Sequence, residues 1–312
     1  MDLHEFQLTP PGTALFTCYP QTVSMDLSPA GGPSDGHVLE SIFEEVDLAS
    51  GRVLLEWRSL DHIPVSDSYK PVGASYDYLH VNSIDVAPDG NLLISARHTW
   101  ALYKVDHRTG EIMWRLGGKR SDFSMGHEAQ VSWQHDVRMP SNATITLFDD
   151  GSDGLQSTES QSQGLVLAVD ETARTVRVAR SYRHPRSLLA SAMGSMQTLP
   201  DGNVLVGWGT APYASEFGAD GTLVADARMP SPLYSYRVSR TPWTGTPAGV
   251  PALSVDRSQG RAPAPSMSAG TAQSISPAGT CTGGALRTGW PSSAPPRGAG
   301  SKPRSASAGA AT

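Results

Sequence analysis

Three histidines stand at the start of apolar, strand-like segments, each a few residues before a turn signal. They are His4, His80 and His135, and Arg97-His98 closes the second segment that follows His80. An arginine stays charged and offers a planar fork of donors that suits a tetrahedral oxyanion such as a sulfuryl or phosphoryl group. Imidazoles beside a guanidinium can bind an anion, activate a phenol or form a covalent intermediate. The spacing alone does not choose among these chemistries.

Metal binding is the main alternative for these histidines, because three imidazoles and a water form a known catalytic zinc arrangement. The positive charge of Arg97 opposes a cation nearby, so we expect no metal and no cofactor. Taken singly, each histidine could equally be a structural residue, and only their recurrence at one phase of a repeat favours a shared function. Four histidines in turns or linkers are expected at the surface: His62, His107, His127 and His184.

A two-part repeat supplies the elements that would position these residues. Its first part is a strand, a turn containing Pro-Gly or Pro-Asp-Gly, and a second strand, found at 6–15, 84–93 and 196–205, with a shorter copy at 137–146. Its second part contains a Ser-Gly or Thr-Gly turn and ends in tryptophan, at 46–57 and 105–114. Such turns supply the positive φ of tight reversals, so each repeat predicts two hairpins. Trp57 and Trp114 are expected to pack between neighbouring sheets.

Stacked four-stranded sheets of this kind are typical of β-propellers, because a single sheet cannot bury both of its faces. The repeat places blades near 4–57, 80–116, 135–182 and 193–229. A fifth blade is expected to begin around Tyr234. The innermost strands of a propeller line a central channel, so His4, His80 and His135 are expected to converge there.

Composition and charge narrow the class of protein. The 312 residues include 31 Gly and 24 Pro, which favour short strands and tight turns, so the fold class is expected to be all-β. A net charge of −6 offers no basic face for nucleic acid, and no apolar run approaches a membrane span. The polar, acidic first five residues do not resemble an export signal. Cys18 and Cys281 lack metal-binding spacing, and Cys18 is interpreted as a strand cysteine.

The sequence changes character after about residue 250. Residues 251–312 are dominated by Ala, Ser, Gly and Pro and lack the strand-turn repeat. We therefore expect blades within residues 1–250, followed by a tail that is disordered or read in a shifted frame. Four blades and a fragment leave a propeller ring open, so the chain is expected to be incomplete at one or both ends.

Several motifs resemble the arylsulfotransferase family, in its actinobacterial and fungal branch. They are His80-Val81-Asn82-Ser83-Ile84-Asp85, Ser95-Ala96-Arg97-His98, Trp114-Arg115-Leu116-Gly117-Gly118 and Gln134-His135-Asp136, and the likeness runs from about residue 2 to 246. The resemblance implies a six-bladed propeller that moves a sulfuryl group from an aryl sulfate to a phenol without a nucleotide sulfate donor. It also implies an extracytoplasmic or cell-envelope location.

The same resemblance assigns roles residue by residue. His135 resembles the nucleophile that becomes transiently sulfated, and His80 with Arg97 resembles the pair that holds the sulfuryl oxygens. His4 resembles a channel histidine that assists proton transfer. Further substrate contacts are implied for Asn82 and His98.

Two other interpretations of the sequence stay open. A propeller can keep its channel residues for binding alone, so the chain could be a non-catalytic ligand-binding or scaffold protein. A quinoprotein-like dehydrogenase shares the Gly-to-Trp repeat, but the carboxylates expected for its metal are missing from this sequence.

Overall fold

The computed structural model describes residues 1–10, 12–73 and 75–245, and this part of the chain is all-β. Four sheets follow one another in chain order. The first contains β1 (Phe6–Thr9), β2 (Thr13–Met25), β3 (Gly36–Asp47) and β4 (Val53–Arg58). The second contains β5 (Val81–Val86), β6 (Leu92–Ala96), β7 (Ala101–Val105) and β8 (Ile112–Gly117).

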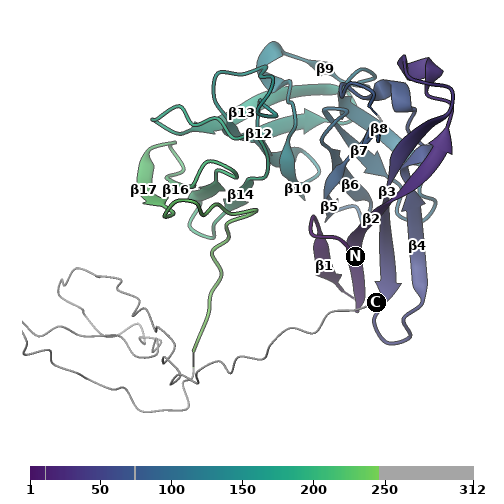
Figure 1. The fold of residues 1–312 in the computed structure, drawn as a ribbon. Coiled ribbons are helices and arrows are strands. Elements are labelled where there is room, and N and C mark those ends of the chain that lie inside the picture. Colours follow the sequence, from purple (N-terminus) through teal and green to yellow (C-terminus); the bar gives the residue numbers. More distant parts are fainter. Residues whose placement is uncertain (11, 74, 246–312) are drawn as a thin grey trace, which may run out of the picture. The chain divides into compact units, whose positions relative to one another are not determined.

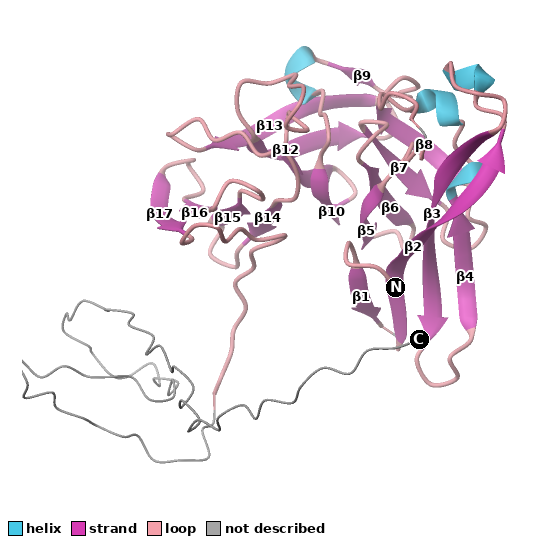
Figure 2. Ribbon diagram, in the orientation of Figure 1, coloured by secondary structure: helices cyan, strands magenta, loops and turns pink. Residues whose placement is uncertain are grey.

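The third sheet contains β10 (His135–Ser141), β11 (Thr144–Asp149), β12 (Gln163–Asp170) and β13 (Thr175–Arg183), with the two-residue β9 (Ser124–Met125) parallel to β13 at its edge. The fourth contains β14 (Ser195–Thr198), β15 (Val204–Gly207), β16 (Tyr213–Phe217) and β17 (Leu223–Arg228). Short 3₁₀ turns lie in the connections (Figure 2), at η1 (Ser28–Ala30), η2 (Ser59–Asp61), η3 (Val65–Asp67) and η4 (His127–Ala129).

Within residues 1–241 the four sheets are arranged as an arc, with the first strand of each sheet on its inner side (Figure 1). The inner strands β5, β10 and β14 are in contact, since β10 packs against both of the others, and β5 also packs against β2 of the first sheet. Turn residues fix this pattern locally. Gly90 and Gly110 adopt φ of 84° and 78° in the predicted Asp-Gly and Thr-Gly turns, which only glycine tolerates at little cost. The fold is β-propeller-like, as the repeat predicts.

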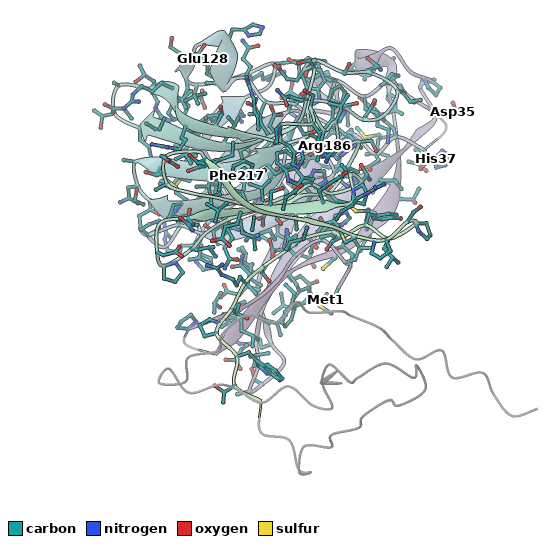
Figure 3. The ribbon with its side chains drawn as sticks, turned by 90° about the vertical axis from the view of Figure 1, so that its left-hand side faces the viewer. Met1, Asp35, His37, Glu128, Arg186 and Phe217 are labelled. Carbon is teal, nitrogen blue, oxygen red and sulfur yellow. The ribbon has the colours of Figure 1, made fainter. Side chains whose placement is uncertain are left out.

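The hydrophobic core is divided into three clusters, each lying between two successive sheets. Phe43 of the first sheet packs with Ile94 of the second, and Leu116 of the second packs with Ile145 of the third. Phe217 of β16, labelled in Figure 3, is buried in the cluster between the third and fourth sheets. Each sheet therefore buries a face only by stacking on its neighbour, which is the physical reason why the sequence repeats.

Trp57 and Trp114 lie between neighbouring sheets, as predicted from their place in the repeat. Trp57 of β4 is fully buried and its indole N–H donates to the carbonyl of Gly110 in the second sheet, at 3.0 Å. Trp114 of β8 packs in the cluster shared with the third sheet. The tryptophan at the end of each repeat thus packs in the hydrophobic cluster shared with the following sheet.

Replacing Trp57 with phenylalanine is expected to lower the free energy of unfolding by about 1–3 kcal/mol, because it leaves a gap and an unpaired buried carbonyl at Gly110. Urea unfolding followed by circular dichroism measures the change. Trp243→Phe serves as the matched control, because Trp243 is 77% exposed and its replacement is expected to change stability by less than about 0.5 kcal/mol. Equal effects of the two substitutions would contradict the inter-sheet role.

One expectation from the sequence is wrong, and another stays a prediction. No strand is assigned in the described residues 229–245, and the fifth blade expected to begin around Tyr234 stays a prediction. This segment instead hydrogen-bonds to side chains of β14, with the Val238 amide donating to Ser195 Oγ at 2.9 Å. His184, expected at the surface, is buried and stacks edge-on to Trp208, because the connection after β13 folds over the fourth sheet.

The chain divides into two compact units, residues 1–241 and 242–312. The predicted low-complexity tail, residues 251–312, lies outside the described residues. Among the described residues, none of the helices is long and apolar enough to span a membrane.

Candidate functional site

His80 is positioned by an unusual backbone turn just before β5. It adopts φ of 57°, a left-handed conformation that costs energy in most residues and is often found at functional sites. Its carbonyl accepts the amide of Arg97 at 3.0 Å, which joins the start of β5 to the end of β6. The His80 Nδ1 donates to the carboxylate of Asp77 at 2.7 Å. Burial lowers the pKa of His80, so the ring is neutral near pH 7.

Asp77 also holds the second histidine of this blade. The His98 Nδ1 donates to the backbone carbonyl of Asp77 at 2.6 Å, and the rings of His80 and His98 are 5.0 Å apart. Burial opposes ionisation of Asp77, yet the hydrogen bond from His80 leaves its pKa below the ordinary value. One carboxylate-bearing residue therefore orients two imidazoles.

Arg97 lies at the centre of this cluster without a carboxylate partner. Its Nη1 donates to His98 Nε2 at 2.9 Å and its Nη2 to the carbonyl of Ser191 at 2.8 Å. Burial lowers its pKa, and the negative charge of Asp150 opposes this shift, but a guanidinium remains charged near pH 7. Among the described residues, no carboxylate lies within ion-pair distance of Arg97. A half-buried positive charge without a carboxylate partner attracts an anion.

His135 is the first residue of β10 and is buried. Its Nδ1 lies 2.6 Å from Asp150 Oδ2, and the amide of Met193 points at its Nε2 from 3.3 Å. An N–H aimed at Nε2 requires a lone pair there, which assigns the proton to Nδ1 and makes Asp150 its acceptor. Burial holds the pKa of His135 well below its usual range, and Arg97 adds to this effect. The result is a neutral imidazole whose Nε2 carries a lone pair and accepts the Met193 amide.

His4 and Tyr236 complete the cluster. The His4 ring lies edge-on to His80 with centroids 4.8 Å apart, and its Nδ1 donates to Asp2 Oδ2 at 3.1 Å. Tyr236 lies beside both His4 and His135, with ring centroids 5.9 and 6.4 Å away. The next residue, Arg237, forms a two-point ion pair with Glu5, at 3.0 and 3.1 Å, and so fastens this segment to the first sheet.

The structure thus brings together the residues predicted from the repeat, but not at one register. His80 immediately precedes β5, His135 begins β10, and His4 stands two residues before β1. Asn82, predicted to contact substrate, is fully buried within β5 and its amide donates to the carbonyl of Gln134 at 2.7 Å. Its Oδ1 has no hydrogen-bond partner among the described residues. The substrate contact of Asn82 stays a prediction.

Sequence reasoning missed the carboxylates and the tyrosine of this site. They are Asp2, Asp77, Asp150 and Tyr236. A signal existed for Asp150, because two consecutive aspartates follow the apolar run that becomes β11, and acidic residues ending a buried strand are candidate partners for a histidine. Asp77 lies three residues before His80, in a segment without strand pattern, and nothing in the repeat marks it.

One group of side chains has the composition of a metal site. Asp77, His80 and His98 each offer a ligand atom within 4.8 Å of the others. Three of their four ring nitrogens are already engaged, however, since both Nδ1 atoms donate to Asp77 and the Nε2 of His98 accepts from Arg97. The neighbouring guanidinium disfavours a cation, and the donor set fits an anion better than a metal.

The burial of His98 gives stability a pH dependence. Burial lowers the pKa of His98 to about 3, whereas an unfolded histidine titrates near about 6.5. Below about pH 6.5 the unfolded chain takes up a proton that the folded protein does not, so this contribution to stability declines by about 1.4 kcal/mol per pH unit as pH falls. Urea unfolding between pH 7.5 and 5 measures the free energy of unfolding. For His98→Gln we expect its slope against pH to be smaller than that of the wild type by the equivalent of one proton. Identical slopes would refute the buried neutral state.

The fold and the site define a β-propeller-like protein that gathers carboxylate-backed histidines around an unpaired arginine. A family model described as Arylsulfotransferase (ASST) matches residues 1–229. The chain therefore belongs to the arylsulfotransferase family, which confirms the resemblance read from its motifs and supports an arylsulfotransferase-like function in general.

Other comparisons are more distant. No curated protein matches the sequence. Similar solved structures include a luciferin-regenerating enzyme (12% identity, TM-score 0.39, covering 73% of this chain and 62% of that one) and virginiamycin B lyase from Staphylococcus aureus (10%, 0.36, 70% and 61%). Hydrazine synthase from Kuenenia stuttgartiensis is also similar (13%, 0.37, 60% and 43%). The chain spans less than two thirds of the length of each of these structures.

Proposed function

We propose that this protein transfers a sulfuryl group from an aryl sulfate to a phenol through a covalent intermediate on His135. The observation that carries the proposal is the pairing of a buried, unprotonated His135 Nε2 with an unpaired Arg97 nearby. A nucleophile and a fixed positive charge are the two groups that sulfuryl transfer needs. The family supports the same activity.

In the first half of the reaction, the Nε2 lone pair of His135 attacks sulfur and the bond between sulfur and the aryl oxygen breaks. The electron pair leaves on the aryl oxygen, which takes a proton from protonated His4. Burial raises the pKa of Asp150 well above its ordinary value, so its role depends on the ionised form: as a carboxylate it accepts the hydrogen bond of the Nδ1 proton and stabilises the positive charge that forms on the imidazole. Arg97 stabilises the sulfuryl oxygens, and His98 holds the guanidinium in place.

In the second half, a phenol occupies the place of the product. His4 takes the phenolic proton, the phenol oxygen attacks sulfur, and the bond between sulfur and Nε2 breaks with its electrons returning to His135. Asp2, hydrogen-bonded to His4, stabilises the protonated ring in both halves. His80, neutral with its proton on Nδ1, accepts a hydrogen bond from the phenol through its unoccupied Nε2 and cannot donate to the sulfuryl oxygens in this tautomer. No cofactor enters either step.

The test is a transfer assay with 4-nitrophenyl sulfate as donor and phenol as acceptor, without any nucleotide sulfate. We expect release of 4-nitrophenol together with an equal amount of phenyl sulfate. A folded protein that binds the donor but releases no 4-nitrophenol would contradict the proposal and favour a ligand-binding propeller. From the family we also propose an extracytoplasmic location, which fractionation of cells that produce the native gene product would test.

A further inference from the structure

A cavity of about 110 Å³ opens between the first and second sheets and ends at two of the site's histidines. One wall comes from β2 and β3, and the other from the segment that leads into β5. Its lining includes Asp2, His4, Thr17, Cys18, Ile42 and His80. The proposed reaction steps do not involve this cavity.

The cavity has one apolar and one hydrogen-bonding part. Cys18 and Ile42 are paired directly across β2 and β3, so their side chains lie on the same face of the sheet. Burial raises the pKa of Cys18 to about 11, so the sulfur presents a neutral thiol that behaves as a small apolar group. His4 and His80 form the polar part, each with a carboxylate behind its Nδ1.

We propose that this cavity is the aryl subsite, in which the phenol ring contacts Cys18 and Ile42 while its oxygen lies at His4 and His80. The inference rests on the proposed function and adds a substrate class to it. The cavity is mostly lined by polar side chains, and its volume of about 110 Å³ leaves room for a single benzene ring against its apolar part. The subsite therefore accepts one-ring phenols and excludes fused two-ring phenols such as 2-naphthol.

A larger cavity in the described part of the chain does not suit this role. It measures about 660 Å³, and its lining includes Asp85, Asp136, Arg138 and Arg237 but none of the site's histidines. Its arginines are already paired, since Arg138 lies 2.8 Å from Glu5 and 2.7 Å from Asp136. A neutral ring gains little among paired charges, and its oxygen would have no imidazole of the site nearby.

Acceptor selectivity tests the assignment. With phenol and 2-naphthol competing in one reaction, Ile42→Ala is expected to raise the ratio of naphthyl to phenyl sulfate at least tenfold over the wild type, because it removes the side chain that blocks a second ring. Competition makes the ratio independent of how much protein is folded. Ile145→Ala removes an equally buried isoleucine outside the cavity and is expected to leave the ratio unchanged. An unchanged ratio in Ile42→Ala would overturn the proposal.

Alkylation of Cys18 tests binding without requiring turnover. Phenol is expected to slow the reaction of Cys18 with N-ethylmaleimide at pH 9 at least fivefold, relative to Cys281 in the same molecule, as read by peptide mass spectrometry. Protection by phenol in a protein that transfers no sulfuryl group would support the subsite and refute the proposed reaction. Transfer without protection and without a change in selectivity would refute the subsite alone.

Discussion

His135→Ala is expected to lower the turnover of 4-nitrophenyl sulfate by at least about 10⁴-fold, because no other imidazole of the site combines an unprotonated Nε2 with a fully buried carboxyl partner. The loss should appear in kcat and in kcat/KM alike, since the variant can still bind the donor but cannot form the bond to sulfur. Steady-state release of 4-nitrophenol measures both constants.

The burial of His135 also predicts how the wild type responds to pH. Its pKa lies well below the usual histidine range, so the nucleophile stays unprotonated as the pH is lowered. We therefore expect kcat/KM for the donor not to decrease when the pH is lowered past about 6.5. The control for the substitution is His127→Ala, because His127 is exposed on η4 and touches none of the site. Comparable losses in the two variants, or less than a tenfold loss in His135→Ala, would refute the assignment of the nucleophile.

Arg97→Gln is expected to lower kcat/KM for the donor by about 10²–10³-fold. Glutamine keeps a polar side chain at this position, but it removes the fixed charge that faces the sulfuryl oxygens as they gain electron density in the transition state. Most of the loss should therefore fall on kcat. Arg97→Lys is expected to recover part of it, because an ammonium restores the charge without the two-point geometry.

The matched control for this substitution is Arg186→Gln, since Arg186 is an exposed arginine, labelled in Figure 3, whose replacement should leave both constants within about twofold. If Arg97→Gln raised KM alone and left kcat intact, Arg97 would serve ground-state binding only. If Arg97→Lys and Arg97→Gln were equally impaired, the charge itself would not be the important property.

The sequence predicts the sheets well, because each depends on local signals. The turn glycines Gly90 and Gly110 need positive φ, and the apolar segments around them must cover the faces of two sheets, so pattern and structure agree. The proximity of His80 and Arg97 could also be predicted from the sequence, because His80 precedes the first strand and Arg97 follows the second strand of the same hairpin. The repeat therefore locates the imidazoles and the guanidinium of the site.

The residues that contact these imidazoles and the guanidinium could not be predicted from the repeat. Asp77 reaches His80 only because the left-handed turn at His80 folds the preceding segment back, and nothing in the repeat encodes that turn. Tyr236 enters the site because Arg237 pairs with Glu5, more than two hundred residues away in the chain. Such long-range ion pairs depend on the packing of sheets and have no local pattern.

His184 was expected at the surface because it lies in a connection between strands, and this prediction is wrong. A histidine after a strand usually lies in solvent, but this one is covered by Trp208 and accepts the amide of Arg186 at its Nδ1, at 3.1 Å. Its Nε2 lies 3.2 Å from Asp226. A tertiary contact with the fourth sheet thus overrides the local expectation.

Rapid quenching of the wild type after mixing with excess 4-nitrophenyl sulfate, followed by intact and peptide mass spectrometry, tests the central claim most directly. The account predicts a gain of one SO₃ unit on the peptide that contains His135, labile in acid as expected for a nitrogen-sulfur bond, lost on adding phenol and absent from His135→Ala. Turnover without any such adduct, or an adduct on another residue that persists in His135→Ala, would contradict it.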